Sequence, residues 1–401
     1  MEKIRFWLIG MLAALCAGSC VYDYDPVVNG TKNVLVIEGD ILVGSYTRVR
    51  LSTSGRLDGQ QEGMDPNLRD IHIWVEASDG KRYGGGYGTL IDTRAADPSL
   101  EYRLLVESVR GTYASSWLPV LRSAPIDSLS YTISADRETM TIDISSADGS
   151  DSPYYRWIAQ ENWEYHAPFQ ASHYFVQSWG YDREGIQHPK DTVVPFKNGD
   201  NTYYCWNSDR IHDVLIASAE AMSDKRIIRH PLYSMNCYEQ RASYIYSVEV
   251  TQEVLSETAF RYWETMLKNS VDVGGLFSPE PFEMRGNIYN VADSSEMVVG
   301  YINVTVPAVK RIFIDSQDIQ FGKTPRGTYD IEPTFVDKSA WRSFSRRGYL
   351  VYALHTEESA GTGREGPETY TFDWLPARCV DCAIWGSGNK QKPSYWPNNH
   401  R

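Results

Sequence analysis

Short segments in which apolar and polar residues alternate constrain the fold of this chain more than any other feature. Such alternation places successive side chains on opposite faces of a β-strand. Between two of these segments, Asp79–Gly80 favours a type I′ hairpin turn. About six short strands with this pattern over residues 33–122 predict a small immunoglobulin-like β-sandwich. The segments are Val34–Ile41, Tyr46–Leu51, Ile71–Glu76, Tyr102–Glu107 and Thr112–Leu121.

A second and larger β domain is predicted over residues 123–385. It begins after a linker at Ala124–Ser128, where alternating segments resume. The chain contains 27 Tyr and 12 Trp, and these residue types favour pleated, half-buried surfaces. We therefore expect a mainly β protein with two sandwich-like domains and an irregular tail over residues 386–401. The strands expected first in the second domain are Leu129–Ile133, Thr139–Asp143 and Tyr154–Trp163.

One amphipathic helix is predicted near residues 256–269, within the second domain. Ser256 is a typical N-cap residue at its start. Phe260, Trp263 and Leu267 recur at helical spacing and form one apolar stripe. We expect this stripe to pack over one sheet of the domain.

The first residues have the parts of an export signal followed by an anchor. Lys3 and Arg5 make a positively charged start, and Phe6–Ala17 form an apolar core. This core is shorter than the ~20 residues that a membrane-spanning helix needs. The sequence Ala-Gly-Ser-Cys that ends at Cys20 resembles the lipobox of bacterial lipoproteins. We expect residues 1–19 to be a signal peptide, Cys20 to be lipidated, and residues 20–32 to form a polar tether.

The net charge limits the partners of the exported chain. With 52 acidic and 39 basic residues, the formal charge is −13. Nucleic acid binding rewards Lys and Arg side chains that neutralise phosphates, and a polybasic segment is needed to hold anionic lipid. The composition therefore argues against nucleic acid and leaves the lipid on Cys20 to hold the protein at its membrane. Because a single acyl chain binds only marginally, we expect a multiply acylated cysteine that carries palmitate.

Several short motifs appear along the chain in a distinctive order and spacing. Beyond Cys20 they include Gly111-Thr112-Tyr113 ahead of Pro125–Ser128, Cys205-Trp206, Gly275-Leu276-Phe277, Cys379–Cys382 and Pro393–Trp396. Together they resemble a family of Bacteroidota outer-membrane lipoproteins known as domain of unknown function 4249. Members are usually encoded beside a TonB-dependent outer-membrane receptor, so the resemblance implies an accessory lipoprotein of a transporter. Asp23 and Asp25 resemble the acidic surface-export signal of Bacteroidota lipoproteins, which implies exposure at the cell surface.

Four further cysteines bear on the covalent structure. Cys205, Cys237, Cys379 and Cys382 form an even set in an exported chain, which predicts disulfides, with three possible pairings. Sequence proximity favours Cys205–Cys237 together with Cys379–Cys382. Pro and Gly residues around the last pair predict a loop, whereas thioredoxin-like chemistry needs a helix N-terminus that lowers a thiol pKa. The single short spacing also argues against a four-cysteine zinc site.

No motif in the sequence predicts a catalytic, cofactor or metal site. Gly361–Gly366 matches the dinucleotide fingerprint letter for letter, but Pro367 and an alternating segment follow where that motif requires a helix. The eight His residues are scattered, with neither the HExxH pattern of zinc proteases nor the GxSxG pattern of serine hydrolases. We therefore expect a protein that is not an enzyme and that has no cofactor.

Aromatic residues are densest between Tyr154 and Tyr181. Tyr155, Trp157 and Ala159 share one face of a strand, so we expect them in the core. The segment after them lacks clean alternation, which predicts a loop. Exposed aromatic side chains in a loop supply rigid contact area for a partner or a flat ligand. Our candidates for such contacts are His166, Phe169, Tyr174, Phe175, Trp179 and Tyr181.

The expected function is a binding role at the outer membrane. Tethering through Cys20 raises the effective concentration of the protein beside a receptor without strong intrinsic affinity. We expect a non-enzymatic accessory or substrate-capture partner of a TonB-dependent transporter. A surface adhesin or structural β-sandwich lipoprotein is one alternative. A degradative hydrolase is another, and it requires titratable groups that converge in a cleft with shifted pKa values.

Overall fold

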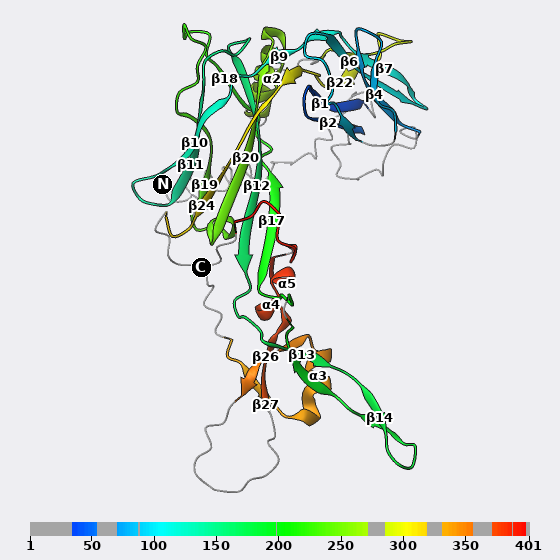
Figure 1. Cartoon of the computed structure of the whole chain (residues 1–401), viewed down its shortest axis with the longest axis vertical. Helices are drawn as coiled ribbons and strands as arrows, with labels where there is room; N and C mark the ends of the chain where they lie inside the picture. Colours follow the sequence, from blue (N-terminus) through cyan, green and yellow to red (C-terminus); the bar gives the residue numbers. More distant parts are fainter. Residues whose placement is uncertain are drawn as a thin grey trace, which may run out of the picture.

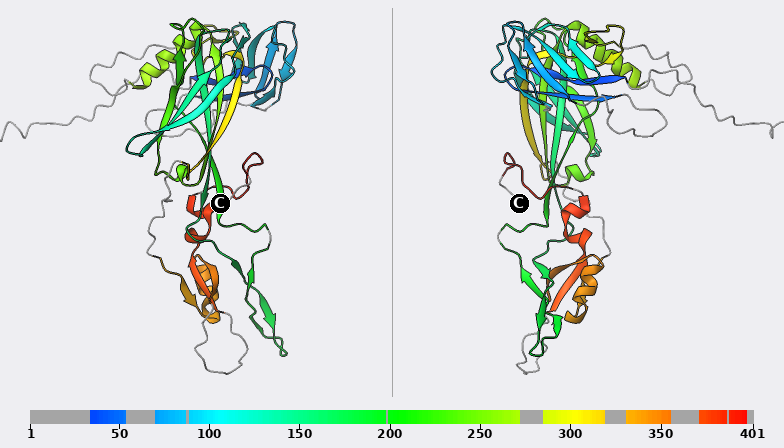
Figure 2. Two further views of the ribbon diagram at one scale, coloured as in Figure 1. Left: turned by 60° about the vertical axis from the view of Figure 1, so that its left-hand side comes forward. Right: turned by 90° about the vertical axis from the view of Figure 1, so that its right-hand side faces the viewer.

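The protein is elongated and mainly β, as the strand pattern predicts. The computed structural model describes residues 34–53, 70–86, 89–197, 199–271, 285–318, 331–355, 371–386 and 388–397. Two β-sandwiches lie side by side at one end, and a smaller distal module of hairpins and short helices lies at the other (Figures 1 and 2). No helix in these ranges is long and apolar enough to cross a membrane. The predicted signal peptide, tether and lipidation site at Cys20 lie outside the described residues.

The N-terminal sandwich packs one mixed and one antiparallel sheet around one apolar core. Each sheet has six strands, and several pairings within the first sheet are parallel. The first sheet has the order β5 (Leu90–Asp92), β2 (Tyr46–Thr53), β1 (Leu35–Leu42), β23 (Val304–Val306) and β9 (Leu121–Arg122), with β22 (Val298–Val299) beside β1. The second has the order β21 (Ile288–Asn290), β7 (Gly111–Ser115), β6 (Glu101–Ser108), β3 (His72–Ala77) and β4 (Arg82–Gly84), with β8 (Leu118–Pro119) beside β6.

This sandwich extends beyond the segment expected to form it. Strands β21, β22 and β23 come from residues 288–306, far along the chain from residues 33–122. Their side chains Ile288, Val298 and Val304 are buried in the same core as Leu35 and Ile37. The expectation of a self-contained domain over residues 33–122 is therefore wrong. An alternating strand shows which face it buries, but its partner strand is chosen by contacts that are distant in sequence.

The hairpin expected at Asp79–Gly80 is present with a different turn. Strands β3 and β4 pair antiparallel on either side of it, and the Ala77 N–H donates to the Lys81 carbonyl at 2.8 Å. The loop therefore has three residues, and Gly80 takes a positive φ of 88° while Asp79 does not. A type I′ turn needs positive φ at both central residues. The loop instead matches a type I turn closed by a glycine bulge, so the predicted turn type is wrong.

The second sandwich holds the largest apolar core of the molecule. Tyr155, Trp157 and Ala159 of its longest strand are almost fully buried there, which confirms the core face predicted for them. One sheet has the order β10 (Ile126–Ile133), β11 (Thr139–Ser146) and β19 (His230–Asn236). The other has the order β17 (Tyr204–Arg210), β12 (Tyr154–His166), β20 (Ile245–Leu255) and β24 (Ala308–Asp315), with β18 (Leu215–Ser218) on β12 and a 3-10 turn, η1 (Gln240–Ala242), before β20.

A buried charge cluster joins the two sandwiches. Arg156 of β12 donates to Asp40 of β1 and, at 2.6 Å, to Glu253 of β20. All three side chains are at most 7% exposed. The residues expected as a linker are also packed, because Ala124 and Ile126 are buried and Ile126 already begins β10. The sandwiches therefore meet through a packed junction.

The predicted helix is present as α2 (Glu257–Val271). The Ser256 hydroxyl accepts a hydrogen bond from the Ala259 N–H at 3.2 Å, which confirms Ser256 as the N-cap. Phe260 is buried against Tyr154 of β12, with ring centroids 4.8 Å apart. The helix covers one end of the β12–β20 pair, as the apolar stripe predicts.

The distal module is built from two stretches that are far apart in sequence. The first is inserted between β12 and β17, and the second follows β24. They share a core in which Trp374 and Trp341 are buried, so this part of the predicted second domain packs separately from its sandwich. Its elements are β13 (His173–Val176), β14 (Trp179–Tyr181), β15 (Gln187–Pro189), β16 (Thr192–Pro195), β25 (Thr334–Val336), η2 (Lys338–Ala340), α3 (Trp341–Arg346), β26 (Tyr349–His355), β27 (Thr371–Pro376), α4 (Ala377–Val380) and α5 (Cys382–Gly386).

Strands β26 and β27, which flank the glycine-rich motif in the sequence, pair antiparallel. The motif itself, Gly361–Gly366, lies outside the described residues.

Candidate functional site

Four of the six aromatic contact candidates are half-buried and pack against other side chains. His166 is the last residue of β12, and its ring packs against Tyr203, Tyr204 and Tyr244. Its Nε2 lies 2.8 Å from a Glu164 carboxylate oxygen. Because β12 continues beyond the alternating segment that predicted it, His166 belongs to a strand and not to a contact loop.

Three more candidates pack within the distal module. Phe175 lies between Trp341 and Trp374, with ring centroids 6.3 and 5.6 Å away. Phe169 packs edge-on against Tyr352, and Tyr174 lies beside Phe196. Phe169, Tyr174 and Phe175 are half-buried against other residues of the module, so they offer less surface for the expected contacts than a free loop would.

Trp179 and Tyr181 are the candidates that the structure exposes. They lie on β14, which pairs with β15 in a hairpin that projects from the distal module (Figure 1). Trp179 is 51% exposed and Tyr181 is 70% exposed, and Ile186 in the turn is 60% exposed. Asp182 organises this turn, since its carboxylate accepts hydrogen bonds from the Glu184 and Ile186 N–H groups.

The base of this hairpin is held by an ion pair across the module. Arg342 of α3 donates to Asp191 through Nε at 2.6 Å and through Nη2 at 2.8 Å. It also donates to the Ser178 carbonyl at 2.6 Å, and its guanidinium lies 3.8 Å from the Trp179 ring centroid. Hydrogen bonding to Arg342 lowers the pKa of Asp191. Arg342 therefore positions the first aromatic ring of the hairpin.

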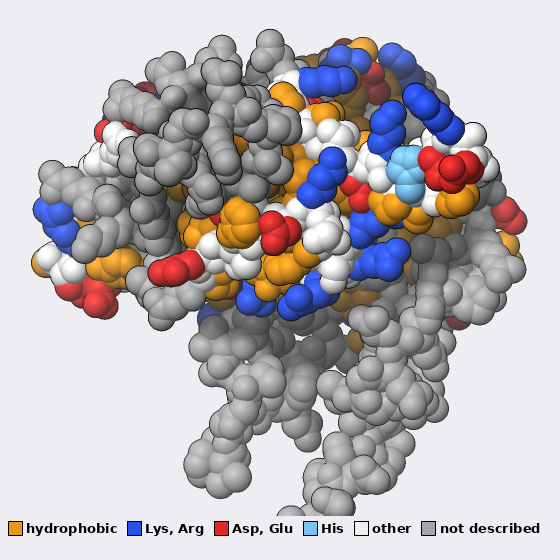
Figure 3. Space-filling model, turned by 90° about the horizontal axis from the view of Figure 1, so that it is seen from below, with side chains coloured by type: hydrophobic (Ala, Val, Ile, Leu, Met, Phe, Trp, Pro, Cys, Tyr) orange, Lys and Arg blue, Asp and Glu red, His pale blue; other side chains and the backbone are white. Residues whose placement is uncertain are grey.

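The surface beside the hairpin carries charges of both signs and is partly apolar. Lys338, Arg346 and Arg347 are exposed on η2 and at the end of α3, and Phe335 of β25 is 44% exposed. Seen from this end of the molecule, hydrophobic side chains lie among Lys and Arg side chains (Figure 3). Aromatic residues and Arg are enriched at protein interfaces, and Trp, Tyr and Arg dominate their binding energy. We refer to Trp179, Tyr181 and Ile186 below as the hairpin tip.

The cysteines pair in a way that sequence proximity does not indicate. Cys205 of β17 forms a disulfide with Cys382 of α5, and Cys237 and Cys379 are buried free thiols. The predicted pairs Cys205–Cys237 and Cys379–Cys382 are therefore wrong. Residues 377–386 fold as two short helices, not as the expected loop, and this places Cys382 against β17 while Cys379 faces the module core. Burial raises the pKa of Cys379.

The C-terminal tail is irregular, as predicted, and it is also packed. Trp206 of β17 and Asn389 exchange two backbone hydrogen bonds of 2.8 Å. Trp396 is buried, and its indole N–H donates to Glu164 at 2.8 Å. The tail therefore runs back over the β12–β17 pair up to residue 397, where the described residues end.

Sequence reasoning missed Asp191 and Arg342, which are separated by 151 positions. Neither lies in a motif, and their pairing becomes visible only once the two stretches of the distal module have packed together. Within the described ranges, no three His, Cys, Asp or Glu side chains come together in a way that could hold a metal ion.

Comparison with known proteins places the chain in a family. No curated protein matches it. A family model described as a domain of unknown function (DUF4249) matches residues 21–311, which include the N-terminal sandwich, most of the second sandwich and the β14–β15 hairpin. The motifs Cys379–Cys382 and Pro393–Trp396 lie beyond the matched range. Because the match takes in well over half of the chain, this protein belongs to the DUF4249 family.

Proposed function

We propose that this protein is a cell-surface lipoprotein of the outer membrane that assists a TonB-dependent transporter by binding to it. The observation that carries the proposal is the hairpin tip, where Trp179 and Tyr181 are exposed on a base held by Arg342. Large aromatic side chains exposed on a rigid support are the usual anchors of a protein interface. The role is therefore one of binding and not of catalysis.

Rigidity at the base favours binding by the tip. Ordering a mobile loop on association costs roughly 0.5–1.5 kcal/mol for each immobilised side chain. The bidentate Arg342–Asp191 pair and the turn bonds to Asp182 hold the hairpin before a partner arrives.

The position of the hairpin agrees with a tethered accessory protein. Strand β1, the first described element, lies at the opposite end of the molecule from β14 (Figure 1). At ~3.5 Å for each residue, the stretch from Cys20 to Val34 reaches about 50 Å at most. A lipid on Cys20 would keep the N-terminal sandwich close to the membrane and leave the hairpin tip free to meet a neighbouring receptor. Confinement of this kind supplies effective concentration in place of intrinsic affinity.

Co-purification from outer membranes in mild detergent tests the proposal. The native protein should retain a TonB-dependent receptor, and a Trp179→Ser/Tyr181→Ser double variant should reduce recovery of that receptor at least tenfold. Tyr238→Ser is the matched control, because Tyr238 is 59% exposed on the second sandwich, far from the tip. Recovery of the receptor unchanged by the tip variant would exclude the hairpin as the contact. Absence of any such receptor from the native preparation would exclude the accessory role.

The anchor has a separate test. Cys20→Ala should release the protein from membranes into the soluble fraction, while protease accessibility of the native protein on intact cells reports its surface exposure. Retention of the Cys20→Ala variant in the membrane would contradict lipidation at this residue.

A further inference from the structure

The hydrogen-bond pattern of the β14–β15 hairpin shows which backbone groups face outward from each of its edges. The Lys190 N–H donates to the Ser178 carbonyl, and the Asp182 N–H donates to the Ile186 carbonyl, each at 3.0 Å. In an antiparallel pair, bonded positions alternate with positions whose N–H and C=O groups point away from the partner strand. The outward positions between these two bonds are Trp179 and Tyr181 on β14, which lie opposite Pro189 and Gln187 on β15.

The outer edge of β15 is blunted against further pairing. Pro189 faces outward there, and proline has no N–H to donate. The β13–β16 pair repeats this arrangement. Pro195 of β16 lies opposite His173, one position from the bond of 2.9 Å that the Phe196 N–H donates to the Ser172 carbonyl. Proline on an exposed edge is one of the means by which proteins prevent the addition of another strand.

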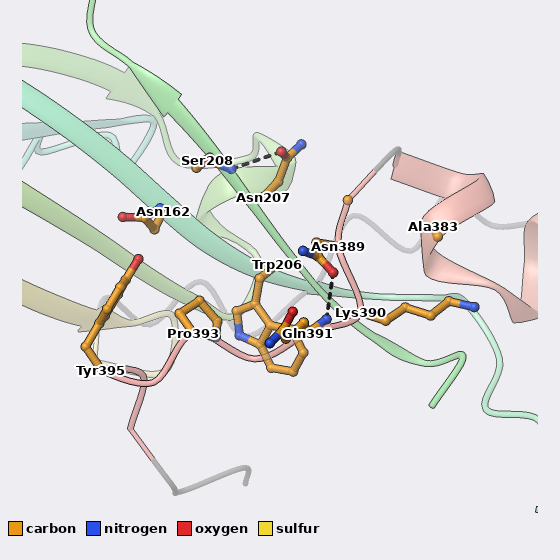
Figure 4. A pocket seen from close by; sticks show the side chains of 11 residues that line it. Asn162, Trp206, Asn207, Ser208, Ala383, Asn389, Lys390, Gln391, Pro393 and Tyr395 are labelled. Atoms are coloured by element: carbon orange, nitrogen blue, oxygen red, sulfur yellow. Dashed lines mark hydrogen bonds between the residues drawn. The ribbon is translucent and has the colours of Figure 1, made fainter. Parts of the chain in front are cut away.

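The outer edge of β17 is protected in a different way, by the C-terminal segment of the chain. Trp206 and Asn389 exchange two backbone hydrogen bonds of 2.8 Å, and Figure 4 shows the segment that carries Asn389 beside Trp206. The segment therefore uses backbone groups that this edge would otherwise offer to a partner.

The outer edge of β14 has neither kind of protection. Its residues Trp179, Gly180 and Tyr181 include no proline and no charged side chain. Within the described part of the chain, β14 pairs with β15 alone. The Trp179 and Tyr181 side chains are also exposed. An edge with outward N–H and C=O groups and no such protection is a template for pairing with another chain.

Both ends of this edge are fixed before a partner arrives. At the base, Arg342 donates to the Ser178 carbonyl at 2.6 Å, and its guanidinium lies over the Trp179 ring. At the turn, the Asp182 carboxylate accepts the Ile186 N–H at 2.8 Å. A strand that is already extended and held at both ends lowers the cost of ordering on association.

The geometry of the edge selects an extended polypeptide as its occupant. Outward N–H and C=O pairs recur at every second residue of a strand, ~6.6 Å apart. Another extended backbone carries the same pairs at the same spacing, so it can bond to Trp179 and Tyr181 together. Sugar hydroxyls and lipid headgroups have no such repeat. The two rings lie on one face of the hairpin, where side chains at alternate positions of an added strand would pack against them.

We propose that the outer edge of β14 binds an extended segment of a partner protein as an added β-strand. The proposal rests on the proposed function, in which the hairpin tip contacts a TonB-dependent receptor, and it specifies the form of that contact. The receptor supplies an unpaired strand with apolar side chains at alternate positions. Backbone hydrogen bonds hold the strand to the edge, and the Trp179 and Tyr181 rings select its side chains.

Two substitutions at Tyr181 separate the backbone contact from the side-chain contact. Tyr181→Ser removes the ring alone, whereas Tyr181→Pro removes the ring and the outward N–H. Proline is tolerated on an edge strand where its nitrogen faces solvent. In co-purification from outer membranes in mild detergent, Tyr181→Pro should recover at least fivefold less receptor than Tyr181→Ser. Gln187→Pro is the matched control, because it removes an outward N–H from the opposite edge of the same hairpin, and it should recover as much receptor as the native protein.

The outcomes of this experiment distinguish strand addition from the accessory role itself. Equal recovery with Tyr181→Pro and Tyr181→Ser would overturn strand addition and leave a tip that docks through side chains alone. A loss of receptor with Gln187→Pro as large as that with Tyr181→Pro would overturn the assignment to β14. If the native protein retained no receptor, the accessory role and strand addition would both be excluded.

Hydrogen exchange of the native complex supplies a measurement that needs no variant. The Trp179 and Tyr181 amides should exchange at least tenfold more slowly in the co-purified complex than in the purified protein. The Gly180 and Asp182 amides, which face β15, should change less. Mass spectrometry with electron-transfer fragmentation resolves these single amides. Unchanged exchange at Trp179 and Tyr181 would overturn the proposal. Slow exchange of both amides in a purified protein that sediments as a dimer would also overturn it, because a second copy of this chain would then occupy the edge.

Discussion

Cys205 and Cys382 form a disulfide that joins β17 to α5 across 177 positions of sequence, with 5.7 Å between their Cα atoms. The bond lies where the second sandwich meets the distal module. It fixes the short C-terminal helices against the long strands.

Peptide mapping under non-reducing conditions should find this single pairing. After denaturation and alkylation, we expect one linked peptide that contains Cys205 and Cys382, with alkylated Cys237 and Cys379. Both free thiols are buried in the folded protein, so alkylation before denaturation should be slow. A linked peptide containing Cys379 or Cys237 would contradict the structure.

The Asp191–Arg342 pair should control the rigidity of the hairpin. Asp191→Asn leaves a similar shape but removes the charge that two Arg342 hydrogen bonds require. Hydrogen bonds to charged groups contribute roughly 1.5–3 kcal/mol, so hydrogen exchange over residues 176–191 should accelerate. Mass spectrometry of the exchanged peptides measures this. Asp182→Asn is a useful comparison, since it perturbs the turn but not the base.

The Asp191–Arg342 pair should also make the unfolding free energy depend on pH. Hydrogen bonding to Arg342 lowers the folded-state pKa of Asp191 below its ordinary value of 3.8. A lowered carboxyl pKa contributes stability that is fully present above pH 3.8 and is lost as the pH falls through the folded value. The difference in unfolding free energy between native protein and Asp191→Asn should therefore be larger at pH 6 than at about pH 3. Urea unfolding at the two pH values measures it.

The buried cluster of Asp40, Arg156 and Glu253 at the sandwich junction should make the unfolding free energy change with pH in the opposite direction. One Arg156 faces two carboxylates, and burial raises the pKa of Glu253 to about 7 from an ordinary 4.5. A raised carboxyl pKa means that stability falls as the pH rises from 4.5 to about 7 and is level above that range. Glu253→Gln should remove this dependence, so urea unfolding should show its stability relative to the native protein increasing between about pH 5 and pH 8.

Completion of the N-terminal sandwich by residues 288–306 can be tested at one glycine. Gly300 has a φ of +135°, and a Cβ there would lie 2.0 Å from the Ile37 carbonyl oxygen of β1. Gly300→Ala should destabilise the protein by more than ~2 kcal/mol. Gly149→Ala is the control, because Gly149 also has positive φ but faces open space. Equal unfolding free energies in urea would contradict the close approach of this segment to β1.

Local pattern was sufficient for the alternating strands and for the helix α2, but not for the short helices α4 and α5 or the strands β13 and β14. The alternating segments, the N-cap at Ser256 and the core face of Tyr155, Trp157 and Ala159 were all predictable, because each depends on residues a few positions apart. The mainly β fold follows from the same pattern. The contact residues were only partly predictable. Nothing in the local sequence separates the exposed Trp179 and Tyr181 from Phe175, which packs against the distal module.

Features that depend on contacts between distant segments were decided only by the tertiary structure. The β21–β23 segment completes the first sandwich, α3 covers Phe175 and brings Arg342 to Asp191, and α5 takes Cys382 to Cys205. In each case the energy comes from burial or pairing between segments more than a hundred positions apart. A sequence pattern records which face of a segment is apolar, and it carries no record of the segment that will cover that face.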